Sequence, residues 1–345
     1  MDFSRPDNAR KINRIKVLNA LRTGNMSRAE LSRELLINKV SISDITESLI
    51  KDGLIVEMEK EMTTGRPATK LSINRNAGRV FSIELRKASV SVSISDTLGR
   101  VLRFERMPRS ENLWQDIRAT CDRLGKDAKI FGAAVVSHED VEIDLPWPSI
   151  LICPAIAEAR AEIDYVTASL DGFYFVSWNE TIEAAYLKNQ LFDIKSFAHI
   201  RVAKSGKCSC GAEGCLEAVA SGERLRETTG LRSLREIALN DDFVRDPSRA
   251  MVFALSQAVQ ATGARSVMLT GELSALSDQI YADMQTKLTS YLPAERKDVI
   301  IFRSNCKEGG LSIGASILAL DNFFYASNIL EALLKLESSS LHPLT

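Results

Sequence analysis

Residues 208–217 read Cys-Ser-Cys-Gly-Ala-Glu-Gly-Cys-Leu-Glu, which places three thiols within eight positions of the chain. Such close spacing is typical of a metal site and not of a disulfide framework. The two glycines allow the backbone to curl, so that three thiolates can converge on one ion. We therefore predict that Cys208, Cys210 and Cys215 bind a structural zinc ion, which needs one further ligand to complete a tetrahedron.

The fourth ligand that the sequence suggests is His199, which lies nine residues before Cys208. The intervening segment IRVAKSGK can form a strand and a loop that return the chain to the thiols, so we expect a site with three cysteines and one histidine. Two alternatives stay open. The thiols are free in a flexible loop, or His199 belongs to a strand that precedes the site and does not bind the metal.

The pattern Cys-x-Cys-Gly-x-x-Gly-Cys-x-Glu, preceded by a histidine, closely resembles the zinc motif of the ROK family, which contains bacterial repressors, open reading frames and sugar kinases. The stretch SVMLTGELSAL (266–276) resembles the family's strand and glycine turn, and GGLSIGASILAL (309–320) resembles the start of its C-terminal helix. The similarity extends from about residue 9 to about residue 325. It implies an actin-like, two-lobed α/β fold with a sugar pocket in its cleft. We place the lobes at 78–186 and 187–325, and a C-terminal helix and tail at 326–345.

The first 74 residues show the pattern of three helices and a hairpin. Apolar residues at helical spacing predict a first helix over 9–23. Ser27-Arg28-Ala29-Glu30 matches the capping box that begins a second helix. Asn38 can cap a third helix that runs to Gly53 through the apolar residues Val40, Ile42, Ile45, Leu49 and Ile50. The linker between the second and third helices is only about three residues long, which is typical of a helix-turn-helix.

Two strands with a turn between them are predicted next, at 54–59 and 69–73. The whole of residues 1–74 is thus interpreted as a winged helix-turn-helix that binds double-stranded DNA. Its third helix would enter the major groove, where its early residues would reach bases or phosphates: Asn38, Lys39, Ser41 and Ser43. Arg66, between Gly65 and Pro67 at the wing tip, is expected to enter a minor groove. An ordinary three-helix module with a simple turn is the alternative.

Composition agrees with a nucleic-acid partner at one end of the chain. Residues 1–75 hold 14 Lys and Arg against 10 Asp and Glu, whereas the remainder holds 30 against 35. A positive excess is expected where a protein meets phosphates. No run of about 18 apolar residues occurs and the N-terminus is polar, so we predict a cytoplasmic protein with no membrane segment.

The chain departs from the family's kinases where they hold ATP. In place of an Asp-x-Gly-x-Thr loop it reads Glu84-Leu85-Arg86-Lys87-Ala88-Ser89, which has no glycine to bring backbone N–H groups close to phosphates. The family's catalytic Asn-Asp pair is matched by Asn179 and Glu180. The longer glutamate moves the carboxylate by roughly 1 Å, which can cost about 10²-fold in rate. The family's second glycine-rich phosphate loop is missing as well, so we predict no enzyme activity.

The sequence therefore predicts a transcriptional regulator, a repressor, with a degenerate sugar-kinase-like domain. The resemblance implies that Asn179, Glu180 and Glu217 bind the hydroxyl groups of a sugar or sugar derivative. We expect a homodimer or homotetramer, because two-fold symmetric operators match paired heads. The alternatives are a sugar kinase with residual ATP-dependent activity and a ligand-independent DNA-binding scaffold.

Overall fold

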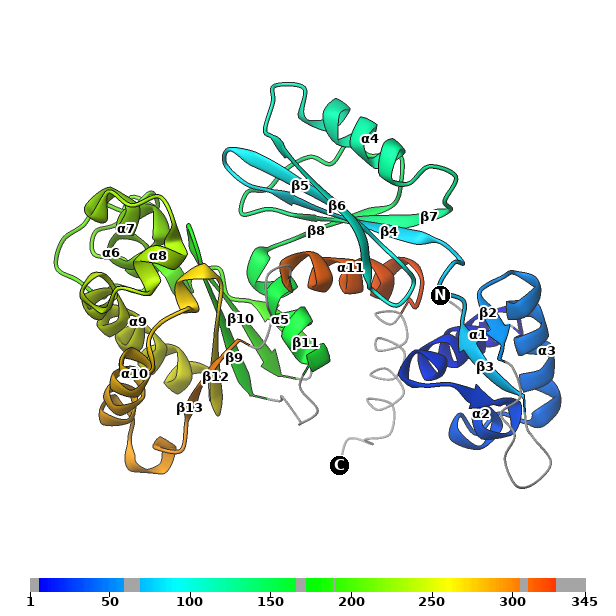
Figure 1. The fold of residues 1–345 in the computed structure, drawn as a ribbon. Helices are drawn as coiled ribbons and strands as arrows, with labels where there is room; N and C mark the ends of the chain where they lie inside the picture. Colours follow the sequence, from blue (N-terminus) through cyan, green and yellow to red (C-terminus); the bar gives the residue numbers. More distant parts are fainter. Residues whose placement is uncertain (1–5, 59–68, 166–171, 189, 305–309, 327–345) are drawn as a thin grey trace. The chain divides into compact units, whose positions relative to one another are not determined.

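The computed structural model describes residues 6–58, 69–165, 172–188, 190–304 and 310–326 (Figure 1). The chain divides into two compact units, unit 1 with residues 1–151 and 315–345, and unit 2 with residues 152–314. This division differs from the expected lobes at 78–186 and 187–325 in a simple way. Residues 173–188 form strands of the unit 2 sheet, and the last helix ends in unit 1. Of the expected tail at 326–345, all but residue 326 lies outside the described residues.

Unit 1 begins with three helices and a small sheet. The helices are α1 (Pro6–Thr23), α2 (Arg28–Glu34) and α3 (Lys39–Lys51). The sheet has the order β1 (Met26–Ser27), β3 (Lys70–Ile73) and β2 (Ile55–Glu57). Apolar side chains from all three helices form a core, each at most 3% exposed: Val17, Leu21, Leu31, Ile42 and Leu49. We call residues 6–58 and 69–74 the head. Arg66, the expected wing-tip residue, lies outside the described residues.

The remainder of unit 1 is a five-stranded sheet with helices packed on it. Its strand order is β6 (Val101–Pro108), β5 (Ser89–Ser95), β4 (Arg79–Leu85), β7 (Ile130–Val136) and β8 (Ser149–Ile152). Figure 1 shows α4 (Leu113–Leu124) over one face of this sheet. The C-terminal part of α11 (Gly310–Phe323) packs against it too, since the hydroxyls of Ser95 and Ser316 share a 2.8 Å hydrogen bond.

Unit 2 contains a second five-stranded sheet. Its order is β11 (Gln190–Asp193), β10 (Ile182–Lys188), β9 (Phe173–Trp178), β12 (Ser266–Thr270) and β13 (Ile300–Arg303). The α-helices are α5 (Pro154–Tyr165), α6 (Leu216–Ala220), α7 (Gly222–Thr229), α8 (Leu234–Ala238), α9 (Asp241–Thr262), α10 (Asp278–Tyr291) and the start of α11. Short 3-10 turns are η1 (Phe197–His199), η2 (Glu272–Ser274) and η3 (Ala294–Arg296).

The two five-stranded sheets share one topology. In each, the first three strands along the chain form an antiparallel meander, and the fourth strand returns parallel to the first. The strand order is accordingly the same when each sheet is numbered from its own first strand. A repeated mixed sheet with helices on it is the architecture expected for two sugar-kinase-like lobes. Among the described residues, no helix is both long and apolar enough to cross a membrane.

Candidate DNA interface and metal centre

Side-chain caps fix the starts of α2 and α3, as the sequence predicts. Ser27 and Glu30 make both hydrogen bonds of the capping box, with the Ser27 N–H donating to Glu30 Oε2 at 2.7 Å. The Ser41 N–H donates to the Asn38 side-chain oxygen at 2.8 Å. Asn38 is therefore an N-cap, and this use of its carbonyl oxygen leaves its amide group for a base or a phosphate.

The face of α3 that points away from the head core is polar at most positions. Three apolar residues of the helix lie in the core, each at most 3% exposed: Ile42, Ile45 and Leu49. Of the four residues expected to reach DNA, Asn38 and Lys39 are exposed, and Ser41 and Ser43 are half-buried. The acidic residues Asp44 and Glu47 share the exposed face. The structure thus brings the predicted contact residues together at the N-terminal end of α3.

Two large apolar side chains stand out beside these polar residues. Leu36 is 91% exposed and Val40 is 73% exposed, the two highest values among the large apolar side chains of the described residues. Leu36 also has a φ of 54°, a left-handed conformation that costs energy for a residue with a side chain. Sequence reasoning grouped Val40 with the apolar residues of the helix and did not select Leu36. Both side chains are therefore accessible to a partner.

Four metal-ligating side chains converge in unit 2, beside the start of α6. The candidate ligand atoms of His199, Cys208, Cys210 and Cys215 all lie within 4.8 Å of one another. His199 Nδ1 is 3.5 Å from Cys208 Sγ, and Cys210 Sγ is 3.7 Å from Cys215 Sγ. His199 ends the short turn η1 and does not lie in a strand. The cluster is therefore the one expected from the sequence.

These separations fit the edges of a metal tetrahedron. Zinc bonds of about 2.3 Å to sulfur and about 2.0 Å to nitrogen, at tetrahedral angles, give an S–S edge of about 3.8 Å and an N–S edge of about 3.5 Å. The observed edges of 3.7 and 3.5 Å agree with both values. Two of the six edges thus match a tetrahedral site and all four ligand atoms lie within 4.8 Å of one another, so the residues can hold a four-coordinate metal ion.

The loop that carries the cysteines is shaped by its own backbone. The Cys208 N–H donates to Ala212 O at 3.0 Å, and the Gly211 N–H donates back to Cys208 O at 3.0 Å. Burial raises the pKa of the Cys215 thiol to about 12, whereas a hydrogen bond with the Ala212 backbone lowers the pKa of Cys210. A bound cation would stabilise the thiolate form of both residues.

Replacement of Gly214 with alanine is expected to disrupt this loop. A Cβ at residue 214 would lie 2.0 Å from Ala203 O, on a backbone with a φ of 74°. Gly211 is the matched control, since it has a φ of 88° and open space around it. Both substitutions impose left-handed strain of about 1–2 kcal/mol, but only Gly214→Ala adds a backbone clash. Gly214→Ala should therefore lower the Tm and the metal content much more than Gly211→Ala does. Equal losses of Tm and metal in the two variants would contradict the placement of this loop.

The residues expected to bind a sugar lie where the β9–β10 hairpin meets α6 and α7. The Asn179 side chain donates to Glu158 Oε1 at 3.1 Å and to Ser177 Oγ at 2.9 Å. Its oxygen accepts from the Glu272 N–H at 2.7 Å. Each of its donors and its acceptor oxygen thus has an internal partner in this structure. Glu158 is almost fully buried, and burial raises the pKa of its carboxyl.

The two predicted glutamates of this junction are also engaged. Glu217 Oε2 accepts from the Ile182 N–H at 2.9 Å, which fastens the hairpin to α6. Glu180 Oε1 accepts from Arg226 Nη1 at 2.5 Å, and the Glu180 side chain is 43% exposed. With this exposure, the Glu180 carboxylate is accessible to a ligand hydroxyl.

Arg226 is a residue of this junction that sequence reasoning missed, because no motif marks it. Its Nη1 binds Glu180, while its Nε is buried and has no hydrogen-bond partner among the described residues. A buried donor without an acceptor is unfavourable. A ligand oxygen that accepts from Nε would remove this cost.

In unit 1, the segment that the sequence predicts to lack a phosphate loop contains an ion pair. Arg86 Nε lies 2.5 Å from Glu84 Oε1, and Glu84 is 9% exposed. The Arg86 N–H donates to Ser89 O at 2.9 Å and closes the β4–β5 hairpin. This backbone N–H is thus used within the hairpin, and the carboxylate of Glu84 would repel a phosphate.

Residues 196–322, which include the whole metal cluster, match the family model described as ROK family. These residues form a ROK family domain. The xylose repressor of Caldicellulosiruptor bescii is 24% identical to this chain over 260 residues, which are 63% of the chain and 65% of that repressor. The chain therefore spans just under two thirds of this relative. A putative xylose repressor of another Caldicellulosiruptor strain is 28% identical over 97 residues, 27% of the chain and 24% of that protein.

Solved ROK structures share the fold. A ROK family transcriptional regulator, described as a homologue of the E. coli MLC protein, superposes with a TM-score of 0.75 at 18% identity, over 94% of this chain and 98% of its own. A ROK glucokinase from Streptomyces griseus, solved with glucose and AMPPNP, superposes with a TM-score of 0.57 at 16% identity, over 70% of this chain and 99% of its own. The regulator thus matches a part of this chain that has no counterpart in the glucokinase.

Proposed function

We propose that this ROK protein is a transcriptional regulator, a repressor, that binds double-stranded operator DNA through its head. The observation that carries the proposal is the exposed N-terminal end of α3, where Asn38, Lys39, Ser41 and Ser43 lie together. A capped helix with a short turn before it is the element that helix-turn-helix proteins place in the major groove. The names of the repressor relatives and the fold of the regulator structure support this proposal.

The same proposal holds that the ROK domain does not transfer phosphate. The Glu84–Arg86 ion pair lies in the segment that, by its resemblance to the family, corresponds to the phosphate loop of the kinases. In the place of the catalytic aspartate, Glu180 accepts a hydrogen bond from Arg226, which competes with the removal of a proton from a sugar hydroxyl. Both features favour a domain that senses a ligand over one that phosphorylates it.

The proposed effector is a sugar or sugar derivative, and the proposed metal is structural zinc. Glu180 would accept from a ligand hydroxyl, and Asn179 and Glu217 would hold the surrounding backbone. Zinc suits the three thiols and the imidazole of the cluster. We further propose a cytoplasmic homodimer or homotetramer, because paired heads would match the two halves of a symmetric operator.

A gel shift with two lysine variants of α3 tests the proposal. A duplex is first selected from a random library with the full chain. Lys39→Ala, at the start of the helix, should weaken binding by about 1 kcal/mol or more, because a charged contact to a phosphate or base is lost. Lys51→Ala removes the same charge from the exposed last turn of the helix and should bind nearly as the native chain does. Equal effects of both variants would contradict the assigned orientation of the helix.

A further inference from the structure

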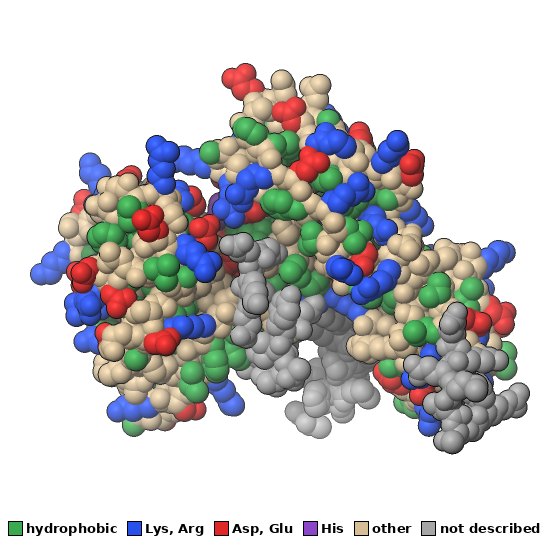
Figure 2. Space-filling model, viewed as in Figure 1, with side chains coloured by type: hydrophobic (Ala, Val, Ile, Leu, Met, Phe, Trp, Pro, Cys, Tyr) green, Lys and Arg blue, Asp and Glu red, His purple; other side chains and the backbone are tan. Residues whose placement is uncertain are grey.

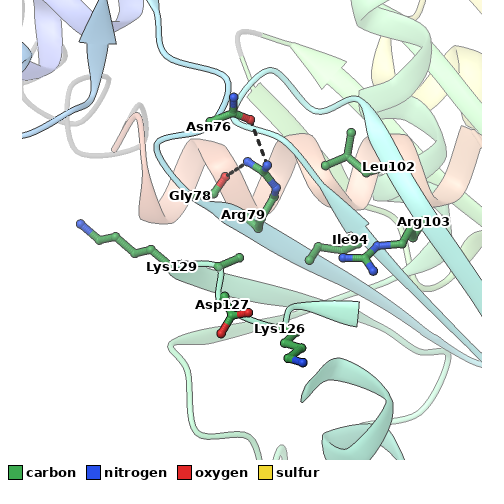
Figure 3. Close-up of a pocket in the computed structure, with 10 residues that line it drawn as sticks. Asn76, Gly78, Arg79, Ile94, Leu102, Arg103, Lys126, Asp127 and Lys129 are labelled. Carbon is green, nitrogen blue, oxygen red and sulfur yellow. Dashed lines mark hydrogen bonds between the residues drawn. The ribbon is translucent and has the colours of Figure 1, made fainter. Parts of the chain in front are cut away.

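A hollow of about 300 Å³ lies in unit 1, at the start of β4 (Figure 3). Its charged lining comprises Arg79, Arg103, Lys126 and Lys129 against one acidic residue, Asp127. The lining thus has four positive charges and one negative charge, although the chain after residue 75 has more acidic than basic residues. Figure 2 shows Lys and Arg side chains on the visible face of the part of unit 1 that contains β4 to β8. Such a hollow favours an anion.

The two arginines of the hollow are held by neutral oxygens. Arg79 donates to Arg75 O at 2.9 Å, to Gly78 O at 2.8 Å and to Asn76 Oδ1 at 3.1 Å (Figure 3). Arg103 donates to Leu124 O. Within the part of the chain that the structure describes, none of the four cations forms a salt bridge. Lys129 Nζ lies 5.3 Å from the centre of the Phe131 ring, and Arg103 is close enough to Glu105 to help lower the pKa of its carboxyl. The bonds to neutral oxygens orient the two guanidinium groups before any ligand arrives.

We propose that this hollow binds the phosphate group of a small phosphorylated metabolite. A phosphate has several oxygens that can accept from the guanidinium groups of Arg79 and Arg103. The exposed Lys126 and Lys129, whose ammonium groups point away from the two arginines in Figure 3, add positive charge around the hollow. The volume of about 300 Å³ lies at the lower end of the range for ligand pockets and suits a molecule of the size of a sugar phosphate. The site is formed within unit 1 and is separate from the sugar-binding candidates, which all belong to unit 2.

The hollow adjoins the segment that joins the head to β4. Asn76 binds Arg79 and, through its N–H, the side-chain oxygen of Asn74 at 3.0 Å. The Asn74 side chain donates to Gly53 O at 2.7 Å, two residues beyond the end of α3. A continuous series of hydrogen bonds thus runs from the hollow to the end of α3, the helix proposed to enter the major groove. A ligand that draws Arg79 away from Asn76 would loosen this series and change how firmly the head is held. This last step rests on the proposed function, whereas the phosphate site does not.

Thermal unfolding of the full chain with inorganic phosphate and with glucose 6-phosphate tests the site. Both probes should raise the Tm in a saturable manner, while glucose, and sodium chloride at matched ionic strength, should not. Arg79→Gln should weaken the probe affinity at least tenfold. Lys126→Gln, at an exposed position, should weaken it several-fold and covers the case in which the Arg79 variant does not fold. Lys297→Gln, a charge removed from unit 2, should leave the affinity unchanged.

Three results would overturn the proposal. The first is a Tm rise that chloride reproduces at the same ionic strength. The second is a saturable rise that neither Arg79→Gln nor Lys126→Gln reduces. The third is no Tm rise with either probe; if Arg79→Gln then lowers the salt dependence of DNA binding by about one counterion, the cations contact the DNA backbone instead. Phosphate binding by a chain that binds no duplex would uphold this site and refute the proposed function instead.

Discussion

Replacement of Cys210 with serine is expected to abolish metal binding and to unfold unit 2 at a much lower temperature. The loop from residue 201 to residue 213 has no buried residue, so apolar packing contributes little to its order. Four ligands on one ion would supply that order, and the loss of one thiolate from a structural site removes most of the binding free energy. We expect the bound zinc to fall from one ion per chain to nearly none, and the Tm to fall on the order of 10 °C.

The control for this experiment is Cys153→Ser. Cys153 is a half-buried thiol of the same unit that is not part of the cluster. Its variant should keep one zinc per chain, and a chelator should reproduce the effect of Cys210→Ser on the native protein. Full zinc content and an unchanged Tm in Cys210→Ser would show that the four residues are not a metal site.

Removal of a thymine methyl group from the duplex is expected to lower the affinity of the native chain when the thymine is at one of one or two positions in each half-site. Leu36 and Val40 are the most exposed large apolar side chains of the described residues, and both lie at the turn and first residues of the proposed recognition helix. The thymine methyl is the apolar group that the major groove presents to such side chains. Replacement of each thymine by deoxyuridine should cost about 1 kcal/mol at a contacted position, roughly a fivefold loss in affinity.

Val40→Ala should lose that sensitivity at one position. Alanine favours a helix more than valine does, so the head of this variant is at least as stable, and weaker binding cannot be attributed to unfolding. Leu36→Ala should lose the sensitivity at a neighbouring position. Leu239→Ala is the control, because Leu239 is 64% exposed in unit 2, away from the head. If deoxyuridine lowers the affinity of the native chain and of all three variants by the same factor, the two side chains do not contact thymine.

The features that the sequence predicted well are local ones. The capping box at Ser27 and the cap at Asn38 depend on hydrogen bonds over three residues, and both are present. The cluster of Cys208, Cys210 and Cys215 depends on a short loop whose glycines allow the turns. Residue spacing alone is enough to predict such features, because no distant part of the chain has to be placed first.

The features that the sequence did not reveal depend on distant contacts. Val40 is an exception, because 100° per residue already places it on the face opposite Ile42 and Leu49, and the packed head confirms that it faces solvent. The lobe boundary near residue 152 follows from the pairing of β9 with β12, which are about 90 residues apart in the chain. The internal bonds of Asn179 and the buried Nε of Arg226 likewise arise from side chains that tertiary structure brings together.

The most direct test of the regulator function is the ratio of two affinities. The full chain is titrated onto its selected duplex and onto a scrambled duplex of equal length, by fluorescence anisotropy at one physiological salt concentration. A sequence-specific regulator should bind the selected duplex at least about 10³-fold more tightly. A ratio near one, or no binding to either duplex, would contradict the account.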